Sequence, residues 1–451
     1  GACLGFLWYN APPAKIFIVP HERMVTRAPK QFVDFQNDVT AAAIHIATIE
    51  GYESIEHVKR YTALGFGTDQ GKLGNVNGVA ILANALGKDI SETGTTIFRP
   101  AYTPVTFGAI AGRDIGELLD PVRQTPMHQW HAKNGAIWEN VRQWKRPWFY
   151  SLGKESMQQA VQRECQAVRN GVGILDASTL GKIDIQGPDA GRFLDRIYTN
   201  RLSNLSVGSC RYTMMLREDG MVFDDGVVAR LAKNHYVATT TTGGAAEVLQ
   251  WMELWLQTEW PELTVYLTSV TDHWATIAVA GPQSRLVLAK LCDDIELDGD
   301  QFQFMHWRSG RVAGVSARIM RISFTGELSF EINVPADYAQ FIWQECMIAG
   351  AEFGITPYGT ETMHVLRAEK GFVIVGQDTD GSVTPSDLGM NWIVNNRKPF
   401  SFLGKRSLSR SDTNRKNRKQ WVGLQPIDPK AKLPEGGQLG SMGCRPTHCF
   451  R

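Results

Sequence analysis

With 451 residues, the chain is longer than one hydrophobic core usually supports, so two or three domains are expected. Its 43% hydrophobic and 21% charged residues are typical of globular proteins and exclude a disordered chain. The net charge is +1 and the Lys and Arg residues are spread along the chain, which argues against nucleic acid as a partner.

Cysteine and histidine spacing provides no strong metal or disulfide motif. The seven cysteines form no CxxC pair, which predicts reduced thiols in a cytoplasmic protein. His128 and His131 form an HxxH without a third ligand nearby, so two surface histidines and no metal are expected. No apolar run approaches the roughly 20 residues that span a bilayer, so no membrane partner is expected.

The first regular pattern is helical and runs from residue 31 to about residue 72, ending in the glycine-rich loop LGFGTDQGK at residues 64–72. A loop of this kind with a trailing lysine could hold a phosphate. Its spacing, however, is GxGxxxG, whereas a dinucleotide site needs GxGxxG after a buried strand. A P-loop is also excluded, because Leu73 stands where Ser or Thr is required.

Residues 94–112 are rich in Pro, Thr and Gly, which predicts an extended connector. From about residue 126 to residue 403, helical segments alternate with short strands that come as hairpins, and this pattern predicts an α+β fold. One hairpin is expected to turn at Asp219-Gly220, and a second at residues 325–327, between RISF and LSFEINV.

Asp224 and Asp225 interrupt an apolar strand segment, VFDDGVV. Because successive side chains of a strand point to opposite faces, each aspartate shares a face with apolar neighbours. At least one carboxylate is then expected to be desolvated, which raises its pKa and makes it a candidate proton acceptor. The alternative, equally supported, is that the strand frays after Phe223 and both aspartates lie in a solvated bend.

Glu331 alternates with Phe330 and Ile332, which places it on the polar face of a strand. The pattern alone therefore favours an exposed glutamate. Glu331 becomes a candidate site residue only if that face lines a cavity.

Residues 125–410 resemble, motif by motif and in order, the folate-binding aminomethyltransferase family. The motifs are TPMHQWHAKNGAIWENVRQWKRP, GVGILDASTLGKIDIQGPDAGRFLDRIYTN, GSCRYTMMLREDGMVFDDG, SFTGELSFEINVP and LRAEKGFVIVGQDTDGSVTPSDLGMNW. The family includes the glycine-cleavage T-protein and the folate-binding ends of dimethylglycine- and sarcosine-oxidising enzymes. Upstream, FVDFQNDVT, EGYESIEHVKRYTALGFGTDQGK and FRPAYTPVTFGAIAG resemble the segment that precedes the folate domain in alpha subunits of heterotetrameric sarcosine oxidases.

The resemblance implies a tetrahydrofolate site and assigns its residues. Asp225 would help the N10 amine of the folate act as a nucleophile, in agreement with a desolvated carboxylate that accepts a proton. Tyr212 would line the pterin site, and Glu331 would accept hydrogen bonds from the pterin ring, against the exposed position that the pattern favours. Asp224 is expected in the same site.

The chain departs from the T-protein pattern in several motifs. Met363-His364 stands where T-protein has Arg-Asp, SFTGE replaces GYTGE, and DAST replaces DVSH. Because T-protein takes its aminomethyl group from a lipoyl arm, these departures favour a sarcosine-oxidase role. The alternatives are a stand-alone aminomethyltransferase and a folate-binding module without transfer chemistry; the retained Asp225 and Tyr212 argue against the latter.

The resemblance also implies an oxidoreductase complex. A flavin on a partner subunit would oxidise sarcosine, and the imine would pass its one-carbon unit to tetrahydrofolate bound here, giving 5,10-methylenetetrahydrofolate and glycine. The beta subunit would carry FAD, FMN would lie at the alpha–beta contact, and NAD would bind a region preceding the present N-terminus. Gamma and delta subunits would complete the heterotetramer.

Four segments are expected on the same basis. Residues 1–30 would be a remnant of the NAD-binding domain, and residues 31–122 a small helical domain. Residues 123–415 would form the T-protein-like folate-binding domain, and residues 416–451 the truncated start of a terminal β-barrel.

The small helical domain resembles domains of other flavoprotein oxidoreductases that bind an iron–sulfur cluster. The cluster positions are here Asp34, Gln36, Asp69 and Gly74. Because these residues cannot replace thiolates, the glycine-rich loop is expected to be a cluster loop without its ligands. Its backbone could instead meet an anion such as the FMN phosphate. The candidate side-chain contacts for that phosphate are Lys59, Arg60 and Lys72.

Overall fold

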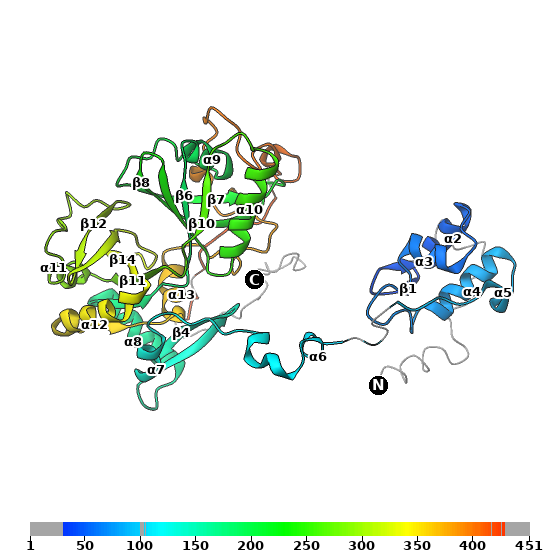
Figure 1. The fold of residues 1–451 in the computed structure, drawn as a ribbon, viewed down its shortest axis with the longest axis horizontal. Helices are drawn as coiled ribbons and strands as arrows, with labels where there is room; N and C mark the ends of the chain where they lie inside the picture. Colours follow the sequence, from blue (N-terminus) through cyan, green and yellow to red (C-terminus); the bar gives the residue numbers. More distant parts are fainter. Residues whose placement is uncertain (1–29, 100–102, 104, 416, 425, 429–451) are drawn as a thin grey trace. The chain divides into compact units, whose positions relative to one another are not determined.

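The computed structural model describes residues 30–99, 103, 105–415, 417–424 and 426–428. The chain divides into two compact units, Gly1–Leu119 and Asp120–Arg451 (Figure 1). The expected NAD-domain remnant and most of segment 416–451 lie outside the described residues. The described residues beyond 416 contain no strand, so the start of a terminal β-barrel is not confirmed.

The first unit is mainly helical but begins with a short strand pair. Its elements are β1 (Phe32–Asp34), β2 (Val39–Thr40), α2 (Ala41–Ile49), α3 (Ile55–Thr62), α4 (Asn75–Leu86), α5 (Ile90–Thr93), α6 (Phe107–Ala111) and η2 (Arg113–Leu119). Thr40 caps α2 by accepting a hydrogen bond of 3.2 Å from the Ala43 amide. The purely helical pattern predicted from residue 31 is therefore wrong at its start, where β1 and β2 pair.

The glycine-rich loop follows α3, as predicted, and is held by the side chains of Asp34 and Gln36. Asp34 accepts a hydrogen bond of 2.8 Å from the Gly65 amide, and the Gln36 amide donates one of 2.9 Å to Thr68. A Cβ on Gly71 would lie 2.0 Å from the Asn75 side chain, so only glycine fits there. Hydrogen-bonded side chains therefore hold the loop closed at these positions.

Residues 94–112 are not extended throughout, because α6 lies within them. The Thr106 side chain caps this short helix by accepting a hydrogen bond of 3.2 Å from the Ala109 amide. The prediction of an extended connector is therefore wrong at residues 107–111, although none of the α6 residues is buried.

The second unit holds two larger sheets and a separate hairpin. One sheet has five strands in the order β10-β6-β9-β8-β7, and the other has six in the order β12-β13-β14-β11-β5-β15. The strands are β3 (Ala136–Val141), β4 (Trp144–Tyr150), β5 (Gly173–Asp176), β6 (Gly181–Gln186), β7 (Cys210–Leu216), β8 (Val222–Ala232), β9 (His235–Thr240), β10 (Tyr266–Ser269), β11 (Trp274–Ala280), β12 (Trp307–Val312), β13 (Val315–Met320), β14 (Ser329–Pro335) and β15 (Thr356–Pro357).

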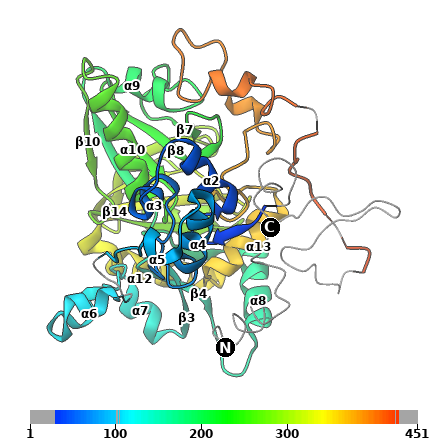
Figure 2. The same ribbon diagram turned by 90° about the vertical axis from the view of Figure 1, so that its right-hand side faces the viewer.

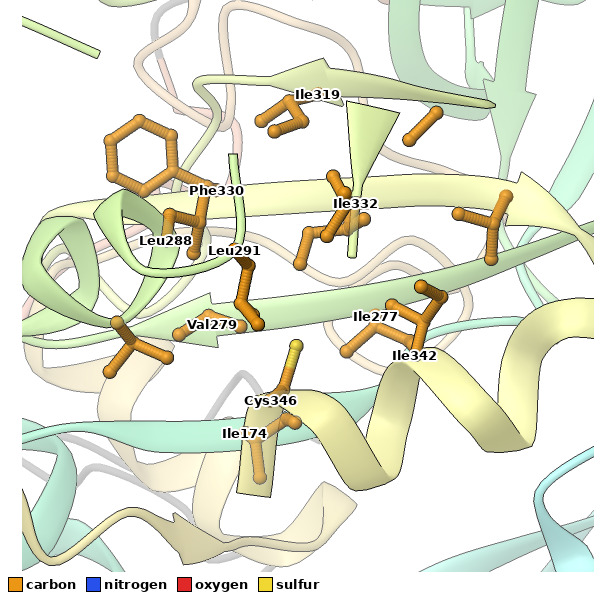
Figure 3. Packing of buried hydrophobic residues seen from close by; sticks show 14 of the residues in the cluster. Ile174, Ile277, Val279, Leu288, Leu291, Ile319, Phe330, Ile332, Ile342 and Cys346 are labelled. Atoms are coloured by element: carbon orange, nitrogen blue, oxygen red, sulfur yellow. The ribbon is translucent and has the colours of Figure 1, made fainter. Parts of the chain in front are cut away.

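Each larger sheet has its own hydrophobic core. The helices of this unit are α7 (His128–Lys133), α8 (Met157–Asn170), α9 (Ala190–Ile197), α10 (Ala245–Thr258), α11 (Ser284–Ala289), α12 (Ala339–Gly350) and α13 (Thr360–Glu369), with 3-10 turns η3 (Ala336–Tyr338), η4 (Ala351–Phe353), η5 (Asn391–Ile393) and η6 (Arg406–Ser409). Helices α9 and α10 pack on the five-stranded sheet (Figure 2). Helices α11 and α12 pack on the six-stranded sheet, where Leu288 and Ile342 meet Ile277 and Phe330 (Figure 3).

The second unit has the mixed α and β composition that the hairpin pattern predicted. Among the described strands, every neighbouring pair is antiparallel except β5 and β15. The Asp219-Gly220 turn joins β7 to β8, as predicted. The second predicted hairpin also exists, but its first strand is β13, which ends at Met320, before the RISF segment.

Candidate functional site

A cavity of about 1750 Å³ in the second unit is lined by both larger sheets. Its walls come from β7, β8, β14 and α13, and from two stretches of the long loop after α13, residues 370–377 and residues between 388 and 397. Small-molecule sites usually measure about 300 to 1,000 Å³. The cavity is therefore large enough for an extended ligand together with a second, smaller molecule.

Strand β8 supplies two carboxylates to this cavity. It continues without interruption through Asp224 and Asp225, which lie opposite Met215 and Met214 of β7. The alternative in which the strand frays after Phe223 is therefore wrong. Gly226 follows at a point where a Cβ would lie 1.9 Å from a carbonyl oxygen of β9, so glycine lets the strands pair beside the carboxylates.

Asp225 is held by Tyr212, which donates a hydrogen bond of 2.5 Å from its hydroxyl to the carboxylate. The two residues are diagonal neighbours across the β7–β8 pair, since Tyr212 lies directly opposite Val227. Burial raises the pKa of Asp225 to about 6, against the lowering effect of the Tyr212 bond. Burial and the Asp225 charge also raise the pKa of Tyr212, so the phenol remains a donor. Asp225 is thus a stronger base than an ordinary aspartate.

Asp224 belongs to the other face of β8, and its side chain is only 4% exposed. It accepts hydrogen bonds from the Thr241 hydroxyl at 2.8 Å and from the Thr241 amide at 3.3 Å. Burial, and next the charge of Asp225, raise the pKa of Asp224 to about 7. The negative charge of Asp225 therefore disfavours ionisation of Asp224.

Glu331 lies on β14 of the other sheet, between Ala278 of β11 and Met320 of β13, and lines the cavity. Burial raises its pKa to about 7, while the nearby Lys182 ammonium lowers it. The exposed position that the pattern favoured is therefore wrong. Lys182 is itself buried, and it donates hydrogen bonds of 2.9 and 3.1 Å to backbone carbonyls of the preceding loop.

Three further residues around these carboxylates were not predicted from the sequence. Trp392 lies with its ring centroid 6.2 Å from that of Tyr212, and Asn200 donates a hydrogen bond of 2.7 Å to the Tyr212 carbonyl. The third is Thr241, which holds Asp224. Polar or aromatic residues at the ends of apolar runs, as in YTN and GMNW, were the available signal.

The departures from the T-protein pattern in α13 fall on the cavity wall. Met363 and His364 both line the cavity. Burial lowers the pKa of His364, whose Nδ1 lies 3.9 Å from a carboxylate oxygen of Glu361. The two residues that depart from the motif, a thioether and an imidazole, therefore belong to the cavity wall.

The HxxH motif is not a pair of surface histidines. His131 is fully buried, and its Nε2 lies 3.1 Å from a carboxylate oxygen of Asp176 while its Nδ1 lies 2.8 Å from the Tyr150 hydroxyl. The prediction is wrong because these partners, which satisfy the imidazole, are distant in sequence. Across the described ranges, no group of three His, Cys, Asp or Glu side chains is arranged to hold a metal ion.

The three cationic residues predicted around the glycine-rich loop do not share one environment. The buried Lys59 donates a hydrogen bond of 2.6 Å to the Ile97 carbonyl, and Arg60 pairs with Glu56 one helical turn away at 3.4 Å. Lys72 is exposed. The proposed role of these residues at a phosphate stays a prediction.

Comparison with known proteins shows the family to which the chain belongs. Residues 127–398 match the GCVT N-terminal domain, and residues 28–113 match the sarcosine oxidase A3 domain. An aminomethyltransferase of Halothermothrix orenii is 30% identical over 64% of this chain and 76% of its own length. The structure of the glycine cleavage system aminomethyltransferase T from Bartonella henselae matches with a TM-score of 0.55 at 26% identity, over 63% of this chain and 73% of that one. The chain belongs to the GCVT aminomethyltransferase family.

Sarcosine oxidase alpha subunits match this chain over most of its length. The sarcosine oxidase subunit alpha of Corynebacterium sp. (strain U-96) is 55% identical over 90% of this chain. Because it covers more residues than the second unit contains, this match includes part of the first unit. The chain spans only 42% of that relative's length. In the described part of the chain, no helix combines the length and the apolar character needed to cross a bilayer.

Proposed function

We propose that this chain is the folate-binding portion of a sarcosine oxidase alpha subunit. In this proposal the cavity binds tetrahydrofolate, accepts the one-carbon unit of oxidised sarcosine and forms 5,10-methylenetetrahydrofolate. The observation that carries the proposal is the Tyr212–Asp225 pair, whose basic carboxylate shares one cavity with Glu331 of the opposite sheet. The 55% identity to a sarcosine oxidase alpha subunit supports the choice of donor.

The cavity has the chemical character that a reduced folate requires. A pterin ring is flat and carries several N–H donors along its edge, which a carboxylate such as Glu331 accepts side by side. Tyr212 and Trp392 offer aromatic surface to the ring. The volume of about 1750 Å³ leaves room for the one-carbon donor beside the folate.

The proposed reaction uses Asp225 as the proton acceptor. When bound on a partner subunit, a flavin would supply the oxidation of sarcosine to its imine. The imine carbon then forms bonds to N5 and N10 of tetrahydrofolate while its bond to the glycine nitrogen breaks. Asp225 takes the N10 proton as that amine attacks, and Tyr212 orients the carboxylate. The two protons lost from N5 and N10 end on the glycine nitrogen, so the reaction balances.

The remaining parts of the assembly belong to the same proposal. FAD is assigned to a beta subunit, FMN to the alpha–beta contact and NAD to a region outside this chain, with gamma and delta subunits as further partners. A cytoplasmic location is proposed because the cysteines form no CxxC pair. The four segments 1–30, 31–122, 123–415 and 416–451 remain the proposed domain division. No reaction step is assigned to Lys59, Arg60 or Lys72.

The test replaces Asp225 with asparagine in the complex that contains this chain. We expect methylenetetrahydrofolate formation to be suppressed while sarcosine oxidation continues, with the imine hydrolysing to formaldehyde instead. Equal loss of both activities would contradict the assignment of Asp225. Co-purification with a flavoprotein supports the oxidase proposal, whereas a fully active monomer would indicate a stand-alone aminomethyltransferase. Folate binding without transfer by the wild type would indicate a non-catalytic module.

A further inference from the structure

The cavity wall opposite the sheets is built largely from irregular chain. Between α13 and η6, the described residues contain only the short turn η5 as regular structure, yet residues 370–377 and several residues between 388 and 397 line the cavity. A loop of this length without a backbone ladder keeps one conformation only if side chains tie it down. The contacts that do so therefore decide the shape of the site.

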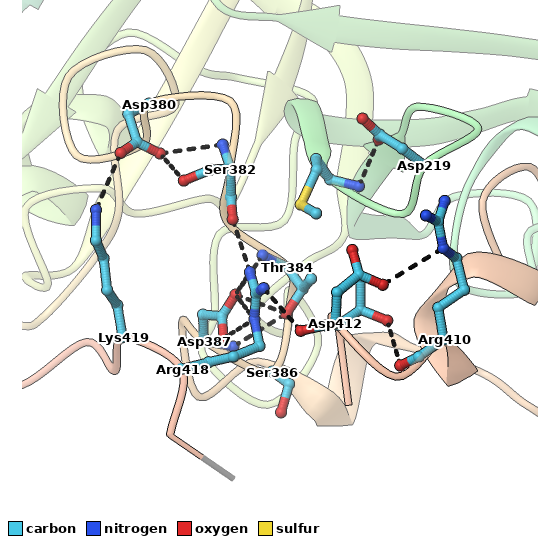
Figure 4. Close-up of polar contacts among 12 residues, drawn as sticks. Asp219, Asp380, Ser382, Thr384, Ser386, Asp387, Arg410, Asp412, Arg418 and Lys419 are labelled. Carbon is cyan, nitrogen blue, oxygen red and sulfur yellow. Dashed lines mark hydrogen bonds and ion pairs between the residues drawn. The ribbon is translucent and has the colours of Figure 1, made fainter. Parts of the chain in front are cut away.

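Asp387 stands at the start of the second wall stretch and is buried, with 5% of its surface exposed. Its carboxylate accepts hydrogen bonds of 2.7 and 2.8 Å from the amide and hydroxyl of Thr384. Two nitrogens of Arg418 also donate to it: Nε to both oxygens, at 2.9 and 3.0 Å, and Nη2 to one of them at 2.7 Å (Figure 4). A buried carboxylate with four donors is a fixed point of the loop.

The segment after Arg418 reaches both wall stretches. The Trp421 amide donates a hydrogen bond of 2.7 Å to the Asp387 carbonyl, and the Trp421 indole N–H donates one of 3.2 Å to the Gly371 carbonyl. Arg418 also donates from Nη2 to the Ser382 carbonyl at 2.7 Å. Residues 418–421 therefore join the beginning of the first stretch to the beginning of the second.

The second stretch leads directly to the candidate catalytic pair. Leu388, next to Asp387, is buried in one cluster with Met214, the residue opposite Asp225 on β7. Trp392, four residues further on, faces the ring of Tyr212, which donates to Asp225. A displacement of Asp387 would therefore move both the apolar support and the aromatic neighbour of the Tyr212–Asp225 pair.

We propose that Arg418 is a positioning residue of the folate site, acting through Asp387 on the wall formed by residues 388–392. The inference rests on the proposed function, since it names the ligand of the same cavity. Lys419 provides the contrast: it pairs with Asp380 at 3.2 Å, and both side chains are more than a third exposed (Figure 4). An exposed pair of this kind contributes little.

The test compares Arg418→Met with Lys419→Met, neighbouring substitutions that each remove one charge. The dissociation constant for 5-formyltetrahydrofolate is measured by calorimetry with the full chain. We expect Arg418→Met to raise it about tenfold, because a buried carboxylate that loses its charged partner no longer fixes the loop that lines the site. The dissociation constant of Lys419→Met should stay within about twofold of the wild type. Arg418→Lys keeps the positive charge but loses the planar guanidinium that donates through two nitrogens, so it should recover part of the affinity.

A third variant separates positioning from general stability. Leu288→Ala removes core volume under the six-stranded sheet, far from the loop in sequence, and lowers the unfolding midpoint. If Leu288→Ala weakened binding as much as Arg418→Met at an equal midpoint, the inference would be overturned. Unchanged hydrogen exchange of residues 371–394 in Arg418→Met would overturn it as well. A wild-type chain that bound no reduced folate would instead refute the proposed function, and the role of Arg418 with it.

Discussion

The raised pKa of Asp225 predicts that its ionised form destabilises the folded protein. A rise from the ordinary value of 3.8 to about 6 corresponds to about 3 kcal/mol above pH 6, at about 1.4 kcal/mol per pH unit. Between about pH 4 and pH 6 the folded state retains a proton that the unfolded state has lost. Stability therefore falls as the pH rises through this window, and the destabilisation persists at higher pH.

Asp225→Asn should remove this destabilisation, because an amide has no charge to desolvate. Because the pKa of about 6 already includes the effect of the Tyr212 hydrogen bond, we expect a gain of about 3 kcal/mol at pH 8. Near pH 4, where the folded wild type is protonated, the gain should vanish. The same substitution should lower one-carbon transfer by about 100-fold to 10,000-fold, the usual contribution of a general base.

Urea-induced unfolding of the full chain at pH 4 and pH 8 measures the effect. Asp219→Asn is the matched control, because Asp219 lies in the turn of the same hairpin, where its exposed side chain accepts a hydrogen bond of 3.0 Å from the Met221 amide. The control should show no pH-dependent gain. A variant less stable than the wild type at pH 8, or equally stabilised at both pH values, would refute the desolvation argument.

Three further substitutions test the site and its support. Tyr212→Phe removes the hydrogen bond that lowers the pKa of Asp225, so the acidic limb of the transfer rate should move to higher pH; an unchanged profile would exclude Asp225 as the titrating base. Glu331→Gln should weaken reduced-folate binding about tenfold or more, as expected for about 1.5 to 3 kcal/mol of charged hydrogen bonding, and calorimetry showing equal affinity would place the pterin elsewhere. Asp176→Asn should lower the free energy of unfolding by about 1 to 3 kcal/mol, because His131 then loses its charged partner. An unchanged urea midpoint would show that the contact between Asp176 and His131 does not stabilise the fold.

Short sequence motifs predicted the turns and strand positions that depend on neighbouring residues. The Asp-Gly dipeptide located the β7–β8 turn, and alternation along VFDDGVV predicted a desolvated carboxylate at Asp224 or Asp225. Glu331 was assigned to a folate site only by the resemblance. The alternation along its own strand indicates a solvent-exposed side chain, because the segments that enclose the cavity around it lie elsewhere in the chain. His131 and Asp176 are 45 residues apart, and Arg418 and Asp387 are 31 apart, so no periodicity within a window could reveal these contacts.

The two separate cores of the second unit have a consequence for how the site comes into being. Asp225 and Glu331 lie on different sheets, each with its own core, and a smaller cluster joins the sheets, in which Cys210, Ala229 and Val237 pack with Met320. The cavity that holds both carboxylates therefore exists only while the two sheets are held together. A ligand that contacts both layers acts as a clamp and stabilises the docked state by about 2.7 kcal/mol at a hundredfold excess over its dissociation constant. In the proposed function a reduced folate is such a ligand, so its binding would strengthen the contact between the two sheets.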